Sequence, residues 1–163
     1  MQSIDKYISA LYQATGWLGL QKSVAPKVWS IDLEDGLKPT FFTLGDAYII
    51  MRGVVLTLPS ALPEREAVIG RAAKMQVAIR RERPSILALE NAGESMAQGL
   101  NLDQDVLICF RRVSSNIETA AFVNEVQDWL NDYGWWMQTL NQEEGQSDVS
   151  NLFHTAMIAG LKI

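Results

Sequence analysis

Residues 105–130 read DVLICFRRVSSNIETAAFVNEVQDWL, and this stretch decides the fold. Its first part, Val106–Phe110, is a short apolar run typical of a buried strand. Ser115 and Glu118 then have the spacing of a capping box, in which each side chain satisfies a free backbone amide at a helix start. A long amphipathic helix is predicted from there, because apolar residues recur at helical spacing: Phe122, Val126, Trp129, Leu130, Tyr133, Met137 and Leu140.

The segments before this stretch predict another strand and another helix. Ser85–Glu90 is typical of a strand, and residues 91–104, which contain two glycines, are predicted to form a loop. Glu64–Arg83 is predicted to be helical and to end at Pro84, because a proline disfavours helix in the residue before it. Its apolar stripe consists of Val68, Ala72, Met75 and Ile79.

Further upstream the apolar residues no longer recur at helical spacing but at every second position. Residues 28–33, 40–44 and 48–58 alternate or are rich in β-branched residues, and short turns separate them. Such segments predict three strands of an antiparallel meander, with Gly53 as a bulge or bend in the third.

The N-terminal part predicts a helix, capped by Ser3 and ended by Gly16. An irregular connector follows at residues 17–26. The complete order is α-β-β-β-α-β-β-α, which predicts an α+β fold: a mainly antiparallel, twisted sheet of about five strands flanked by helices. Residues 1–140 are expected to form one domain, and residues 141–163 a C-terminal extension, either a short docking helix or a tail.

The composition counts against several classes of function and cellular location. The 163 residues carry a net charge of -5, which counts against a nucleic-acid partner because phosphate contacts require a basic surface. The single cysteine, Cys109, allows no internal disulfide and fits a reducing compartment. The first residues lack the pattern of a secretory signal, and no apolar run is long enough to insert into a membrane. A cytoplasmic protein is therefore expected.

The sequence predicts no enzyme, no metal site and no cofactor. His154 has no marked catalytic partner, and Cys109 lies in an apolar strand, where a thiol behaves as a small hydrophobe. Asp32, Glu34 and Asp35 lie at a turn, where acidic residues are common. The basic residues at 80–83 suit a helix C-terminus, and Arg111–Arg112 are expected at a solvated strand edge.

The apolar residues point to protein binding instead. Five tryptophans are expected mostly in the core, yet an amphipathic first helix beside an open sheet is a suitable platform for an extended peptide. The small and flexible residues of the second helix would allow close approach of a second copy.

The order of elements, with the quoted segment 105–130 and a helix after the break at Leu58–Pro59, resembles the class I type III secretion chaperones of Gram-negative bacteria, the Tir-chaperone family. The resemblance covers about residues 3–140. It implies a homodimer without enzymatic activity that binds the non-globular N-terminal segment of one or more secreted effector proteins and keeps it competent for export. The long tail departs from the family pattern, and it could cover the binding groove or contact the export machinery, including its ATPase.

The resemblance also implies two sets of functional residues. The apolar pockets for cargo would be formed by residues of the first helix and the first strands: Ile8, Leu11, Tyr12, Ile31, Phe41 and Ile50. The dimer contact would use the second helix and the strand at 107–110: Val68, Ala72, Met75, Ile79, Leu107 and Cys109.

Two alternatives stay open. The first is a protein-binding or regulatory module of the same fold with no secretion role, which genomic neighbours would distinguish. The second is an enzyme or small-ligand-binding protein, which a deep polar pocket holding His154 with converging carboxylates would favour.

Overall fold

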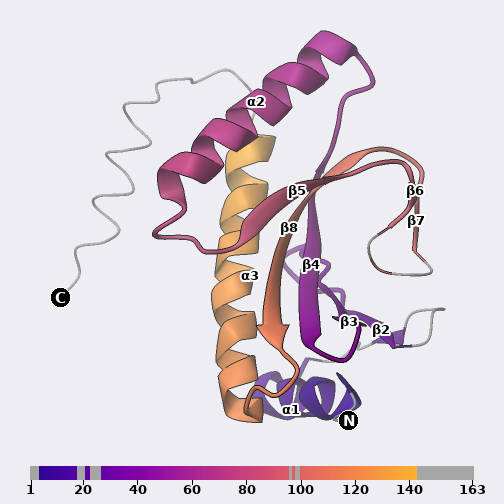
Figure 1. Ribbon diagram of the computed structural model, residues 1–163, viewed down its shortest axis with the longest axis vertical. Coiled ribbons are helices and arrows are strands. Elements are labelled where there is room, and N and C mark those ends of the chain that lie inside the picture. The colour runs from indigo at the N-terminus through magenta and orange to yellow at the C-terminus, as the bar shows by residue number, and fades with distance from the viewer. Residues whose placement is uncertain (1–3, 18–20, 23–26, 96, 98–99, 143–163) are drawn as a thin grey trace.

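The computed structural model describes residues 4–17, 21–22, 27–95, 97 and 100–142 (Figure 1). The predicted order of helices and strands is confirmed, and short strands are added to it. The elements are α1 (Ile4–Thr15), β1 (Gln21–Lys22), β2 (Val28–Ser30), β3 (Thr40–Leu44), β4 (Tyr48–Thr57), α2 (Leu62–Ile79), β5 (Ile86–Glu90), β6 (Gly93–Glu94), β7 (Asn101–Leu102), β8 (Val106–Ser114) and α3 (Thr119–Asn141).

The five predicted strands form one antiparallel sheet, as expected for an α+β fold. The strand order is β1-β2-β3-β4-β8-β5, so that β8 lies between β4 and β5. The connector predicted to be irregular contributes a sixth, two-residue strand, β1, which pairs with β2. The predicted loop between β5 and β8 contains a small hairpin, β6-β7.

All three helices contribute to a core on one face of the sheet. Figure 1 shows α3 running along the strands, with α1 near its N-terminal end and α2 crossing near its C-terminal end. This core is built around large buried side chains. The tryptophans join it as predicted: Trp129 and Trp136 are fully buried, and Trp17, Trp29 and Trp135 pack against it.

The opposite face of the sheet is covered by the segment between β5 and β8. Val28, Phe42 and Ile50 form a second apolar cluster with Ala97, and Leu100 packs against it. Beside this cluster lies a buried ion pair, in which the Arg52 guanidinium donates to both carboxylate oxygens of Glu90. The Ser95 hydroxyl also donates to Glu90, at 3.3 Å.

The capping box predicted at Ser115 and Glu118 is wrong. Helix α3 begins at Thr119, and its N-cap, Glu118, makes no side-chain capping bond. The Ser115 hydroxyl donates instead to the Asp46 carbonyl, because β8 continues to Ser114 and Ser115 is held against the β3–β4 turn. The Tyr7 hydroxyl of α1 reaches the carbonyls of Ser115 and Ile117 at 2.7 and 2.8 Å.

The role predicted for Gly53 also needs correction. The irregularity in β4 lies between Val54 and Leu56, whereas Gly53 pairs regularly with Cys109. Gly53 is required for another reason, because a Cβ atom at this position would lie 2.4 Å from the ring of Tyr133. The predicted stop of α1 at Gly16 is confirmed by its left-handed φ of 66°. Ser3 and residues 143–163 lie outside the described residues.

Candidate protein-binding surfaces

The residues predicted to bind cargo are mostly in the core of the chain itself. Four of them lie together in the core between the helices and the sheet: Ile8 and Leu11 of α1, with Ile31 and Phe41. Ile50 lies in the cluster on the opposite face of the sheet. The sixth residue is exposed: Tyr12 retains 44% of its accessible surface. A role of this set in binding cargo stays a prediction, but only Tyr12 presents a large side chain to a partner.

Other exposed apolar side chains lie at the same end of the sheet as α1. Leu44 and Tyr48, which flank the β3–β4 turn, are 54% and 38% exposed. This turn and α1 both contact the segment after β8, since the Ser115 N–H donates to the Ala47 carbonyl and the Tyr7 hydroxyl reaches the Ser115 carbonyl. We call Tyr12, Leu44 and Tyr48 the α1-end surface. Sequence periodicity did not identify Leu44 or Tyr48 because both lie at strand ends beside a turn.

The residues predicted for the dimer contact divide into two groups. Three of them are buried in the core between the helices and the sheet: Ala72, Leu107 and Cys109. A charge at Ala72 would therefore destabilise the fold, whether or not α2 forms an interface. The other three are half-buried and pack against the same core: Val68, Met75 and Ile79. The large apolar residues of α2 that remain exposed are Leu62, at 64%, and Val77, at 79%. The outer face of α2 is thus available to a partner through residues outside the predicted stripe.

The outer edge of β5 is partly occupied by α2. The Gln76 side-chain amide donates to the Ser85 carbonyl at 3.2 Å, and its oxygen accepts from the Leu87 N–H at 2.7 Å. One side chain therefore takes the place of a neighbouring strand at the start of β5. Covering an edge in this way limits direct pairing with another chain.

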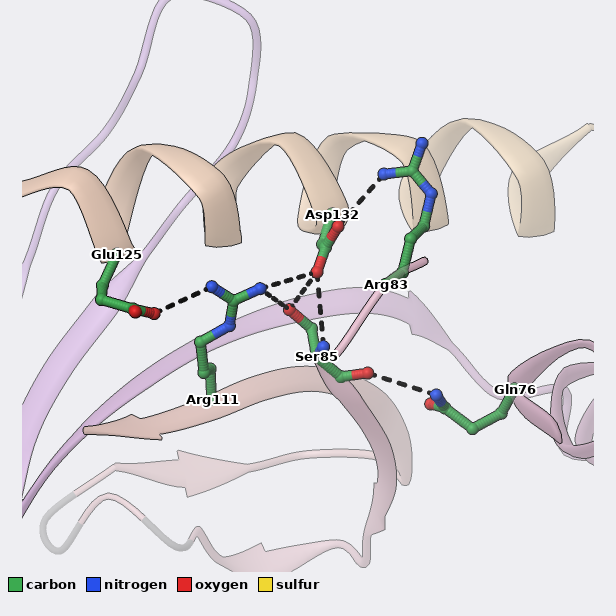
Figure 2. A network of polar contacts seen from close by, with 6 residues as sticks. All are labelled: Gln76, Arg83, Ser85, Arg111, Glu125 and Asp132. Carbon is green, nitrogen blue, oxygen red and sulfur yellow. Dashed lines mark hydrogen bonds and ion pairs between the residues drawn. The ribbon is translucent and has the colours of Figure 1, made fainter. Parts of the chain in front are cut away.

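A polar network joins β5, β8 and α3, as Figure 2 shows. Asp132 of α3 is buried and accepts from Arg83 at 3.1 Å, from Arg111 at 2.9 Å and from the Ser85 hydroxyl at 2.5 Å. Arg111 also donates to Glu125 at 3.0 Å. The prediction that Arg111 lies at a solvated edge is wrong, because the long α3 helix covers this side of β8. Arg112, which points to the other face, is exposed as predicted.

A half-open hollow of about 890 Å³ lies beside this network, between β8 and α3. Its charged groups are largely paired with one another, as described for Arg111, Glu125 and Asp132. Among the described residues, no ion pair reaches Glu82 or Asp128, whose carboxylates also line it. The full lining is Glu82, Pro84, Ile86, Phe110, Arg111, Arg112, Glu125, Asp128, Asn131 and Asp132.

The single cysteine, Cys109, is unreactive in this environment. Burial raises the pKa of the Cys109 thiol to about 12, and the negative charge of Asp132 adds to the shift. At neutral pH the group is therefore a thiol and a poor nucleophile. Within the described residues, no group of three or more His, Cys, Asp or Glu side chains could hold a metal ion. His154 lies outside these residues. None of the helices in the described part of the chain is long and apolar enough to span a membrane.

In the described residues, these observations define an α+β protein with a six-stranded antiparallel sheet, a small β6-β7 hairpin and three helices on one face of the larger sheet. No family model matches the sequence, and no curated protein matches it. Solved structures do share the fold. The chain matches YbjN from E. coli, a candidate transcription regulator, with a TM-score of 0.56 and 11% identity, over 86% of this chain and 92% of that one.

Two further structures share the fold over most of both chains. A chain from the HopA1-SchA chaperone-effector complex matches with a TM-score of 0.50 and 8% identity, over 83% of this chain and 93% of that one. An uncharacterized protein from Methanothermobacter thermautotrophicus also matches with a TM-score of 0.50, at 6% identity, over 85% of this chain and 96% of that one. Identities this low establish a common fold and leave function to be argued from the surfaces.

Proposed function

We propose that this protein is a cytoplasmic type III secretion chaperone. In this role it binds the non-globular N-terminal segment of one or more secreted effectors, keeps it competent for export, and has no enzymatic activity of its own. The observation that carries the proposal is the fold shared with a chain of a chaperone-effector complex. The secretion ATPase or another part of the export apparatus is a further proposed partner.

The surfaces described above support a role in binding proteins. Tyr12, Leu44 and Tyr48 expose apolar area at one end of the sheet, and Leu62 and Val77 do so on α2. Single exposed apolar residues are ordinary, but several large ones near one end of a sheet are typical of contact with a partner. We assign the α1-end surface to cargo and the outer face of α2 to a second copy of the chain.

Capture of cargo tests this function. With the protein as bait in lysate of its native bacterium, we expect secreted proteins to be recovered and identified by mass spectrometry. A synthetic N-terminal segment of a recovered protein should then bind the purified chaperone. A triple variant with aspartate at the α1-end surface should lose this binding, because charge is costly in an apolar contact. Recovery of a metabolite alone, or of proteins that are never secreted, would contradict the proposal.

Self-association is tested at Val77. We expect Val77→Glu to weaken a dimer at least about tenfold, since it places a charge where an exposed apolar side chain meets its partner. Light scattering over a range of protein concentrations measures the change. Gln127→Glu, which adds the same charge at an exposed position of α3, serves as the control. An unchanged mass for Val77→Glu, with unchanged circular dichroism, would remove this face of α2 from the interface.

A second candidate function is a regulatory module that binds proteins outside secretion. The match to YbjN, a candidate transcription regulator, favours it, because that TM-score exceeds the one for the chaperone complex. Chromosomal neighbours distinguish the two functions: a secretion operon or an adjacent effector gene supports the chaperone.

A further inference from the structure

Helix α3 ends beside α2, which crosses it there (Figure 1). Arg71 of α2 donates from Nη2 to the Leu140 carbonyl at 3.2 Å, and the Asn141 side-chain amide donates to the Val55 carbonyl at 3.0 Å. The Nε atom of Arg71 is buried and has no hydrogen-bond partner among the described residues. The chain therefore continues past Gln142 from a point beside α2, close to a guanidinium that still has a donor to offer.

The sequence beyond α3 has two parts of different chemistry. Residues 143–148, which we call the spacer, contain three acidic side chains and no basic one. In residues 149–163, which we call the apolar segment, Phe153, Met157 and Leu161 lie four positions apart, a spacing that would place them on one face of a helix. A negatively charged stretch is thus followed by one that is able to cover apolar surface.

The C-terminal half of α2 offers a complementary surface. Val77, at 79%, is the most exposed large apolar side chain of the described residues. Lys74 and Arg81 lie three positions before it and four after it, so they share its face, and both are exposed. None of the ion pairs in the described part of the chain involves either cation. We call Lys74, Val77 and Arg81 the Val77 face.

The helix dipole accounts for only part of this charge. A cation beside the end of a helix, such as Arg81, is favoured by the free carbonyls there, but the effect is confined to the last turn. Helix α2 ends at Ile79, so Lys74 lies before its last turn. The position of Lys74 is better explained by an acidic group that binds beside Val77.

We propose that residues 143–163 bind the Val77 face of their own chain. In this arrangement the spacer supplies carboxylates to Arg71 and Lys74, and the apolar segment covers Val77. Salt screens the first contact and not the second, so the apolar segment supplies most of the binding free energy.

The spacer is long enough to reach this surface, and charge decides its direction. Val77 is six residues from Arg71, or about 9 Å along the helix axis. Residues 143–148 can span up to about 20 Å when extended. The N-terminal half of α2 is within reach as well, but Glu64 and Glu66 are exposed there and carry the charge of the spacer.

The docked segment would regulate the self-association proposed above, and only this consequence rests on the proposed function. Two copies that meet at Val77 would bring Lys74 and Arg81 of one copy near the same residues of the other. Neighbouring like charges weaken such a contact, whereas the spacer brings the opposite charge. The segment of the same chain is therefore the favoured occupant, and a second copy has to displace it.

The test uses the full chain with a nitroxide spin label on the variant Ser150→Cys. The buried Cys109 does not compete for the label, because a thiol that stays protonated at neutral pH is a poor nucleophile. At a concentration where light scattering gives the mass of a monomer, we expect the label to broaden the amide resonances of the Val77 face. The resonance of Tyr12, on α1 at the other end of α3, should keep its width.

Variants of the labelled chain locate the contact. Val77→Glu should reduce the broadening at Lys74 at least about fivefold, because it repels the spacer and removes the apolar contact. Gln127→Glu, which adds the same charge at an exposed position of α3, should leave it unchanged. Phe153→Ser should also reduce the broadening, yet it should strengthen self-association at least about fivefold because the second copy no longer has to displace the segment. Asn151→Ser is its control.

A mixture identifies the occupant. Labelled protein without nitrogen-15 is added to unlabelled protein that carries nitrogen-15, so that only contact between chains broadens resonances. Broadening of the Val77 face in this mixture alone, or none in either sample, would overturn the proposal. If secreted cargo is captured and the face is not broadened, the chaperone function stands and this inference fails. If the face is broadened within one chain and no secreted protein is captured, the docking stands and the chaperone function fails.

Discussion

Glu90→Ala is expected to lower the free energy of unfolding by about 3–5 kcal/mol. The Arg52 and Glu90 side chains are only 4% and 8% exposed, and the guanidinium donates to both carboxylate oxygens. Removing the carboxylate leaves the arginine charge buried without its compensating partner. It also removes the acceptor of the Ser95 hydroxyl, which helps to hold the β5–β8 segment over the sheet. Urea denaturation followed by circular dichroism measures the loss.

Two further variants show whether the buried charge is the cause. The double variant Arg52→Met/Glu90→Leu should recover most of the lost stability, because a buried ion pair is often replaceable by apolar residues of similar volume. Lys38→Ala breaks an ion pair with Asp32 in which both side chains are largely exposed, and it should change stability little. A Glu90→Ala protein as stable as Lys38→Ala would refute the argument.

The sequence predicted the fold well because its strongest signals are local. The alternating strands 28–33, 40–44 and 48–58, and the periodic apolar residues of α3, determine which segments are strands and helices. Local signals failed where a distant segment intervened, as at Ser115, whose hydroxyl donates to the Asp46 carbonyl instead of capping α3. Contacts between distant segments were not predicted at all. The Arg52–Glu90 pair joins residues 38 positions apart, and the Gln76 amide contacts Leu87 across a turn. No period in the sequence indicates which polar groups will meet.

The predicted binding residues are mostly buried for a related reason. An apolar stripe such as Ile8 and Leu11 identifies the face of a helix that is covered, but it does not say what covers it. In this chain the sheet and α3 do so. The residues available to a partner, such as Val77 and Ile86, lie outside the stripes and look like ordinary surface positions in the sequence.

Gly53→Ala should destabilise the protein by about 3 kcal/mol, because overpacking a filled core forces neighbours out of position. The added Cβ atom would lie 2.4 Å from the Tyr133 ring. Two contacts hold the Tyr133 ring in place. It stacks on Trp129, with ring centroids 5.4 Å apart, and its hydroxyl donates to the Val54 carbonyl at 2.9 Å. Since β4 and α3 must separate for the methyl group to fit, the variant should also show an altered near-ultraviolet tryptophan spectrum.

Gly134→Ala is the matched control, since it makes the same chemical change one residue from Tyr133. Its added Cβ atom would meet only a Leu37 methyl carbon, at an ordinary 3.8 Å. Because alanine favours a helix over glycine, this variant should gain up to about 1 kcal/mol. Opposite shifts of the two urea midpoints would establish that Gly53 is needed for the approach of β4 to α3. Equal midpoints would show that Tyr133 has room to move, and the close packing of this strand on the helix would then not depend on glycine.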